Sequence, residues 1–234
     1  MKGKNSYFDR IVPHVEKRYG KEMADSIMQK AWKRFEELCE ENADEPKSHY
    51  IHTRERIYPG IAMFDAMTAE GIGREETADF IVGCYRWRAG KMAPLVRTIF
   101  KIPGLYRIVP KVFFGMTAKM FGPQMGFEAR NKYLGKKEMR FDMVKCPYYE
   151  KCVHYGCPEI VKGYCEADDI VYGNMHPKLR WLFSLSSLVL EKWVFSVHEG
   201  RKAWSGLRAL LPGRLLPVLP EVLMFQPDFS ISPH

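Results

Sequence analysis

Several signals are missing from this sequence of 234 residues. The opening stretch, MKGKNSYFDRIVPHVEKRYG, has no continuous apolar segment followed by small residues, so we see no secretory signal. The most apolar run near the C-terminus, LFSLSSLVL, is too short and too interrupted to form a transmembrane helix. There is also no helix-turn-helix, RNP or zinc-finger pattern, which makes nucleic acid an unlikely partner. We therefore expect a globular, soluble protein located in the cytoplasm.

Cysteine is too scarce for a disulfide scaffold, because the chain has only six. Four of them fall within CPYYEKCVHYGCPEIVKGYCEADD, with spacing C-x5-C-x4-C-x7-C. This spacing lacks the C-x2-C pairs of zinc ribbons and ferredoxins. A zinc or iron-sulfur site formed by the four thiols stays open as an alternative, and its ligands would be Cys146, Cys152, Cys157 and Cys165. We interpret Cys39 and Cys84, which stand alone in helical segments, as small buried apolar residues.

Acidic residues are nearly absent from one long segment. Between Arg86 and Lys137 there are twelve Lys and Arg but a single acid, Glu128, which gives a local net charge of +11 against +8 for the whole chain. Such a block attracts anions, for example a small anionic substrate or the surface of an anionic membrane. The simpler interpretation is the solvated face of amphipathic helices.

The spacing of apolar residues predicts a helical N-terminal half. One long helix or two should cover residues 7–39, and a helix that starts at YPGIA should be closed by Gly71. Another helix should follow the acidic turn of Glu75 and Glu76. Prolines 94, 103, 110 and 123 should then divide the basic block into short helical pieces.

From Glu138 the pattern changes to that of a half-buried strand, with alternating side chains in EMRFDMVKC. Two helix candidates follow, PYYEKCVHY and PEIVKGYCEADDIVYG. The fold class is therefore α+β, a helical N-terminal half followed by a small antiparallel sheet with a cysteine-rich helical hairpin. Along the chain we distinguish a helical region (1–137), a strand with the hairpin (138–180) and a divergent apolar tail (181–234).

Four motifs in this order, MRFDMVKCP, YGCPEI, YCEADD and HPKLR, resemble the core of the L-2-amino-thiazoline-4-carboxylic acid hydrolase family. The resemblance covers about residues 7–180. It implies a hydrolase that acts on a small cyclic amidine or a related C–N bond and opens a carboxylate-bearing ring to give N-carbamoyl-cysteine. The alternative is a non-enzymatic sensor or binding module that uses the clustered cysteines. The sequence assigns no cofactor.

Amidine hydrolysis needs a base or nucleophile and an acid. Asp168, with Asp169 behind it, is our first candidate for orienting the amidine and activating water, and Cys165 and Cys146 are candidates for a nucleophile or a polar wall. Arg140 could hold the substrate carboxylate, and two further residues could contact the substrate, His176 and Glu159. Ordinary structural roles for the Asp and Cys residues remain open.

The tail departs from the family pattern, which continues after HPKLR with an R-T-x-T-L strand and a C-D-F strand. Neither motif occurs here. One hypothesis is a slip of the reading frame just after Arg180. The other is a genuine extension that packs on the protein or, with the basic block 86–137, makes peripheral contact with a membrane through aromatic residues, namely Trp181, Trp193, Phe195 and Trp204.

Overall fold

A computed structural model describes residues 5–186 and 189–197 of the chain. These residues form two compact units, each assembled from several segments of the sequence. The first unit contains the described part of Met1–Arg88 together with Gly122–Glu128 and Val144–Asp168. The second contains Ala89–Phe121, Ala129–Met143 and the described residues from Asp169 onward. The three regions 1–137, 138–180 and 181–234 remain a prediction made from the sequence.

The first unit begins with two helices in place of one long helix. Asn5 caps α1 (Ser6–Tyr19) by accepting a hydrogen bond from the Tyr7 amide at 2.9 Å. Gly20 then adopts a φ of 80°, which glycine reaches without the steric cost that other residues pay, and α2 (Lys21–Glu41) starts directly after it. The apolar faces of the helices meet in a core whose buried members include Phe8, Ile27 and Leu38.

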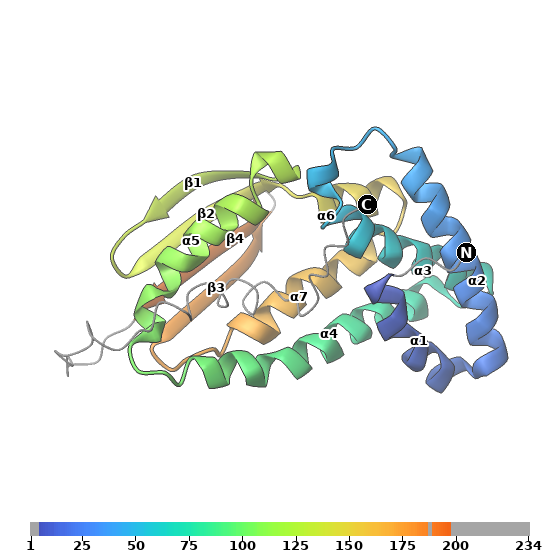
Figure 1. Ribbon diagram of the computed structural model, residues 1–234, viewed down its shortest axis with the longest axis horizontal. Coiled ribbons are helices and arrows are strands. Elements are labelled where there is room, and N and C mark those ends of the chain that lie inside the picture. Colours follow the sequence, from blue (N-terminus) through green and yellow to red (C-terminus); the bar gives the residue numbers. More distant parts are fainter. Residues whose placement is uncertain (1–4, 187–188, 198–234) are drawn as a thin grey trace. The chain divides into compact units, whose positions relative to one another are not determined.

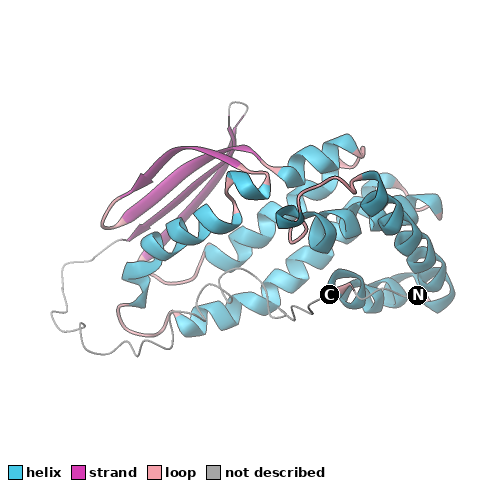
Figure 2. Cartoon of the chain, turned by 45° about the horizontal axis from the view of Figure 1, so that its top comes forward, coloured by secondary structure: helices cyan, strands magenta, loops and turns pink. Residues whose placement is uncertain are grey.

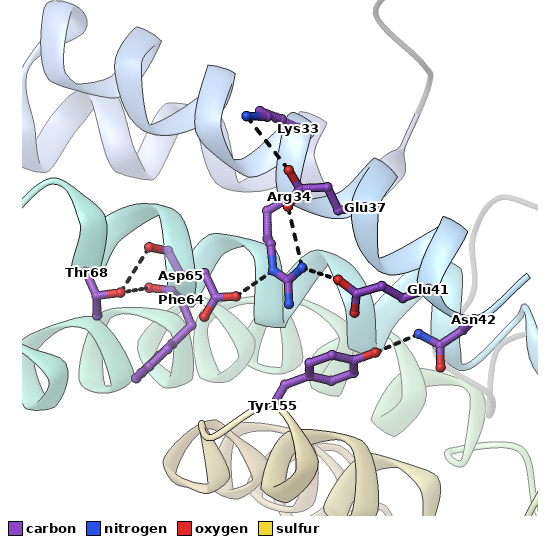
Figure 3. Close-up of polar contacts among 9 residues, drawn as sticks. All are labelled: Lys33, Arg34, Glu37, Glu41, Asn42, Phe64, Asp65, Thr68 and Tyr155. Atoms are coloured by element: carbon purple, nitrogen blue, oxygen red, sulfur yellow. Dashed lines mark hydrogen bonds and ion pairs between the residues drawn. The ribbon is translucent and has the colours of Figure 1, made fainter.

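The third helix, α3 (Tyr58–Ala69), is buried on most of its surface. It ends before Gly71, which has a φ of 84°, as the sequence predicted. Arg34 of α2 links the two helices, because its Nε donates to Asp65 of α3 at 2.9 Å (Figure 3). Its Nη1 donates to Glu41 of α2 itself at 2.7 Å, which holds the guanidinium in place for this charge-assisted contact between the helices.

The fourth helix, α4 (Arg74–Ile99), contradicts one part of the sequence analysis. We expected Pro94 to break the basic block, but this proline lies inside the helix, which continues to Ile99. A long helix tolerates the loss of one backbone hydrogen bond when packing holds its flanking turns, and Ala93 and Val96 are both buried. The later prolines lie outside helix interiors: Pro103 is in the turn after α4, Pro110 is in the first turn of α5 (Val109–Met120), and Pro123 starts a 3₁₀ turn.

The remaining helices match the predicted cysteine-rich hairpin. The sequence CPYYEKCVHY forms α6 (Pro147–His154), which ends before Gly156 with its φ of 73°. Pro158 begins a short 3₁₀ turn that leads into α7 (Val161–Tyr172). The helix candidates of this segment are therefore confirmed.

The second unit contains a sheet of four strands in the order β1-β2-β4-β3 (Figures 1 and 2). The strands are β1 (Glu128–Leu134), β2 (Glu138–Lys145), β3 (Leu179–Ser186) and β4 (Val189–Val197). Both β2 and β3 pair with β4 in antiparallel register. The alternation predicted for β2 is partly present: Met139, Phe141 and Met143 are buried and Arg140 is exposed, but Asp142 is also buried and accepts a hydrogen bond from Asn131 at 2.6 Å. Helix α5 contacts β4, and the α+β class is confirmed.

Part of the apolar tail belongs to this sheet. Although the family's strand motifs are missing from it, residues 179–197 supply β3 and β4, so β2 has a strand partner. Trp181, one of the aromatic residues considered for membrane contact, is 7% exposed and packs against Tyr172 with ring centroids 5.7 Å apart. Trp204 and the side chains of Trp193 and Phe195 lie outside the described residues. In the described part of the chain, no helix has the length and apolar character needed to cross a membrane.

Candidate active site around Arg56

A π-helix precedes α3 and carries the residue at the centre of the site. The backbone of Thr53–Ile57 forms hydrogen bonds five residues back, from the amide of Glu55 to Tyr50 at 3.1 Å and from that of Ile57 to His52 at 2.9 Å. Short π-helical turns are rare in proteins, and those that do occur are often found at functional sites. This turn presents the side chain of Arg56 to the interior of the first unit.

The Arg56 guanidinium has one protein partner and one unused nitrogen. Its Nη1 donates a long hydrogen bond of 3.4 Å to the Tyr148 hydroxyl on α6, whereas its Nη2 is buried without a hydrogen-bond partner among the described residues. Burial disfavours the charge, but the neighbouring Tyr148 hydroxyl, Glu55 and Asp168 more than compensate and raise the pKa of Arg56. An unsatisfied buried donor is costly, and an acceptor atom placed beside Nη2 would relieve that cost.

Tyr148 connects Arg56 to a buried histidine. The Tyr148 hydroxyl lies 3.0 Å from Nδ1 of His52, whose side chain is fully buried against the ring of Phe127. Arginine can only donate, so the Tyr148 oxygen accepts from Arg56. The Tyr148 proton is therefore donated to Nδ1 of His52. This nitrogen must then be unprotonated, so the His52 ring carries its proton on Nε2. Burial raises the pKa of Tyr148 even though Arg56 lowers it, so this hydroxyl stays protonated at neutral pH.

Two more tyrosines extend the cluster away from Arg56. The Tyr164 ring of α7 lies 4.6 Å from the Tyr148 ring and 4.6 Å from the Tyr85 ring, and its hydroxyl donates to the backbone carbonyl of Arg56 at 3.2 Å. Gly60 makes room for this hydroxyl, because a Cβ at that position would lie only 2.5 Å from it. The aromatic stack therefore holds the π-helical turn in place.

Of the predicted catalytic residues, Asp168 lies in this environment. It is half-buried on α7, and its negative charge acts on both Arg56 and Tyr148. Asp169 has a different role, because it belongs to the second unit and accepts a hydrogen bond from the Trp181 indole nitrogen at 2.7 Å. Two adjacent carboxylates of one helix therefore have separate surroundings.

The cysteines gather beside the cluster as free thiols. Cys146, Cys152, Cys157 and Cys165 are all buried and none forms a disulfide. Contact with the Cys157 thiol, together with burial, raises the pKa of Cys152 well above its usual value, so Cys152 is a neutral thiol. Among the described residues, no group of three or more His, Cys, Asp or Glu side chains is arranged to hold a metal ion. The structure thus gives no geometric support to the metal-binding alternative.

The three predicted substrate-binding residues make other contacts. Glu159 forms a surface ion pair with Arg74 at 2.8 Å. Arg140 is exposed on β2, where it faces Glu138 and lies over the Tyr133 ring at 4.9 Å. His176 stacks on the Tyr106 ring with centroids 4.5 Å apart. Both Arg140 and His176 belong to the second unit, and these contacts account for all three side chains without a substrate.

Sequence reasoning missed the residues at the centre of the cluster, namely His52, Arg56 and Tyr148. One signal was present, since the charged segment TRER stands directly before the strongly apolar helix that starts with YPGIA. An arginine next to a fully buried segment needs an acceptor for its charge, either from the protein or from a ligand. The much larger charge excess of residues 86–137 concealed that signal.

Comparison with known proteins gives one match. The family model for L-2-amino-thiazoline-4-carboxylic acid hydrolase matches residues 50–185, a span that includes the whole Arg56, Tyr148 and Asp168 cluster. No curated protein and no solved structure matches the chain.

Proposed function

Because the chain belongs to the L-2-amino-thiazoline-4-carboxylic acid hydrolase family, we propose that it hydrolyses a small cyclic amidine that carries a carboxylate. The reference substrate is 2-amino-thiazoline-4-carboxylate and the product is N-carbamoyl-cysteine. The observation that carries this proposal is the buried Arg56 Nη2 without a hydrogen-bond partner, beside a protonated tyrosine and a carboxylate. A substrate carboxylate would supply the missing acceptor.

The atoms of this reaction balance with one water molecule. The water oxygen bonds to the amidine carbon, and the ring nitrogen gains a proton as its double bond to that carbon opens. The bond from the same carbon to the ring sulfur then breaks, and the sulfur leaves as a thiol. The bond cleaved in this ring opening is therefore C–S, and not a C–N bond. Cleavage of the exocyclic C–N bond would instead release ammonia.

In this proposal each residue of the cluster has its own role in the reaction. Arg56 binds the substrate carboxylate, and Asp168 accepts the proton of the attacking water as general base. Tyr148 keeps its proton at neutral pH, and its hydroxyl, once turned away from His52, donates toward the ring nitrogen or the departing sulfur. Cys146 and Cys165 are both buried and serve in this proposal as walls of the site. A thiolate attack by either residue is the competing pathway.

The test measures two products from 2-amino-thiazoline-4-carboxylate, free thiol with a chromogenic disulfide and ammonia with a coupled assay. We expect thiol without ammonia. Asp168→Asn should lower kcat by about 100-fold or more, as expected for a lost general base, and Asp169→Asn serves as its matched control. Retention of full activity in Asp168→Asn, or absence of both products, would overturn the proposal.

Substrate binding is tested with Arg56→Lys. Lysine keeps the charge but not the planar pair of donors, so we expect KM to rise by about tenfold or more. Arg74→Lys is the control, because Arg74 lies on the surface of the same unit in an ion pair with Glu159. An unchanged KM in Arg56→Lys would remove the guanidinium from substrate binding. An increase in Arg74→Lys would instead return Glu159 and its partner to the site.

A further inference from the structure

The hairpin of β1 and β2 carries basic and apolar side chains on an exposed part of the second unit. β1 lies at the edge of the sheet, and six of its seven residues are exposed (Figure 2). From residue 129 to residue 140 the chain has five Lys and Arg and a single acid, Glu138, which gives a local net charge of +4. The basic residues are Arg130, Lys132, Lys136, Lys137 and Arg140. Such a segment attracts anions.

Hydrogen bonds of the backbone place two lysines at the tip of the hairpin. The amide of Gly135 donates to the carbonyl of Glu138 at 2.8 Å, and this bond closes a turn that contains Lys136 and Lys137. The carbonyl of Lys137 accepts from the amide of Val197, the last residue of β4, at 2.8 Å. Both lysines are exposed, so the turn presents them to solvent from a backbone that the sheet holds in place.

Two apolar side chains stand directly before this turn. Tyr133 is 46% exposed and Leu134 is 42% exposed. Arg140 lies over the Tyr133 ring, with 4.9 Å between its guanidinium carbon and the ring centroid. The same ring lies close to Gly135, because a Cβ at that position would be 2.7 Å from the Tyr133 hydroxyl. An exposed tyrosine among cationic groups, with an apolar ring and a polar hydroxyl, suits the boundary between water and lipid.

The backbone of β1 disfavours a further strand as the partner. Asn131, in the middle of β1, has a φ of 50°, which residues other than glycine rarely adopt, and its side chain donates to the buried Asp142 at 2.6 Å. A strand edge that is interrupted in this way, and that carries lysine, is a poor template for pairing with another chain. The exposed side chains, and not the backbone edge, are therefore what a partner would contact.

We propose that the hairpin of β1 and β2 docks the protein on the surface of an anionic phospholipid membrane. Lys132, Lys136 and Arg140 lie against the lipid phosphates, because Lys and Arg near an anionic surface are attracted to it. Tyr133 and Leu134 enter the interfacial layer, where aromatic and aliphatic side chains leave water.

This contact is narrower than the one expected from the sequence. It uses only the end of the basic block 86–137, together with β2, and it does not use Trp181, which is buried. The hairpin belongs to the second unit and the Arg56 cluster to the first. Membrane docking therefore does not depend on the hydrolysis proposed above.

The test is co-sedimentation of the full chain with vesicles, made either of phosphatidylcholine alone or of an equal mixture of phosphatidylcholine and phosphatidylserine. In about 0.1 M salt we expect the mixed vesicles to bind at least about tenfold more tightly than the neutral ones. Binding should be largely lost in about 1 M salt, because the Debye length falls from about 10 Å to about 3 Å.

A double variant tests whether the hairpin is responsible. Lys132→Gln combined with Lys136→Gln should weaken binding to the mixed vesicles by about tenfold or more. Lys17→Gln combined with Lys21→Gln is the matched control, because both lysines are exposed in the first unit and their loss lowers the net charge equally. This control should bind within about twofold of the parent. If the first double variant does not fold, Lys136→Gln alone decides, with an expected loss of about threefold or more.

Leu134→Ser separates docking through apolar side chains from attraction between charges alone. The net charge is unchanged, and binding to the mixed vesicles should weaken by about threefold or more, because serine gains little by leaving water. Circular dichroism verifies that each variant is folded.

Several results would overturn the proposal. Equal binding to neutral and mixed vesicles, or no binding at low salt, would exclude an anionic membrane as the partner. An equal loss of binding in the two lysine double variants would show that the total charge, and not the hairpin, attracts the vesicles. Unchanged binding in Leu134→Ser would exclude contact through apolar side chains. A single-stranded oligonucleotide that binds more tightly than the mixed vesicles, and loses affinity in the hairpin double variant, would identify nucleic acid as the partner instead.

Discussion

Replacing Gly60 by alanine tests whether the aromatic stack fixes the position of Arg56. The new Cβ would lie 2.5 Å from the Tyr164 hydroxyl, a distance at which one of the two groups has to move. The Tyr164 ring has little freedom, because the Tyr148 and Tyr85 rings each lie 4.6 Å from it. We therefore expect Tyr164 to shift and to lose its hydrogen bond to the backbone carbonyl of Arg56.

The expected magnitude follows from two opposing effects. Alanine in place of glycine favours a helix by up to about 1 kcal/mol, whereas overpacking costs about 1–3 kcal/mol and the lost hydrogen bond costs about 1 kcal/mol. The free energy of unfolding should therefore fall by about 1–3 kcal/mol, which corresponds to a decrease in Tm of roughly 2–12 °C. Urea and thermal unfolding followed by circular dichroism measure both quantities.

Two comparisons make this prediction specific. Gly83→Ala in α4 is the matched control, because a Cβ there meets no atom within 4 Å, so this variant should be as stable as the parent or more stable. Tyr164→Phe removes the clashing hydroxyl, and Gly60→Ala should then cost little in that background. The reasoning fails if Gly60→Ala is as stable as Gly83→Ala, or if Tyr164→Phe leaves its cost unchanged.

Three further predictions concern the second unit and the thiols. Trp181→Phe should lower the free energy of unfolding by about 1 kcal/mol, measured with urea, because the hydrogen bond to Asp169 is lost; no change would show that the bond contributes nothing. Burial, aided by Lys178, lowers the pKa of His176 from 6.5, so the unfolded state binds more protons and stability should fall as the pH drops below 6.5. His176→Gln should reduce this fall, measured as the urea midpoint against pH, and an unaltered slope would contradict the prediction. The four cysteines between 146 and 165 are buried and free, so a chromogenic disulfide should react with them only after unfolding, and rapid reaction of all four in the native protein would refute their burial.

Much of the helical architecture could be predicted from the sequence, because helix formation depends on neighbours a few residues apart. Gly20, Gly71 and Gly156 end or divide helices where positive φ is required, and the hairpin after Cys146 follows from its prolines and apolar spacing. Pro94 was the exception, since packing of the surrounding turns overrides a local preference. Asp168 became a candidate in the same way, from its position on a helix with Cys165.

The pairing of β2 with β4 and the Arg56 cluster depend on contacts between distant parts of the chain. The tail lacks the expected strand motifs, and only its pairing with β2 and β3 identifies residues 189–197 as a strand of the sheet. Arg56 and Tyr148 are 92 positions apart, and Tyr164 reaches the Arg56 carbonyl across 108. The sequence by itself determined the helices, because helix formation depends on local spacing. Tertiary structure alone decided that the Arg56 Nη2 group is buried without a hydrogen-bond partner, because burial is a property of the packed chain.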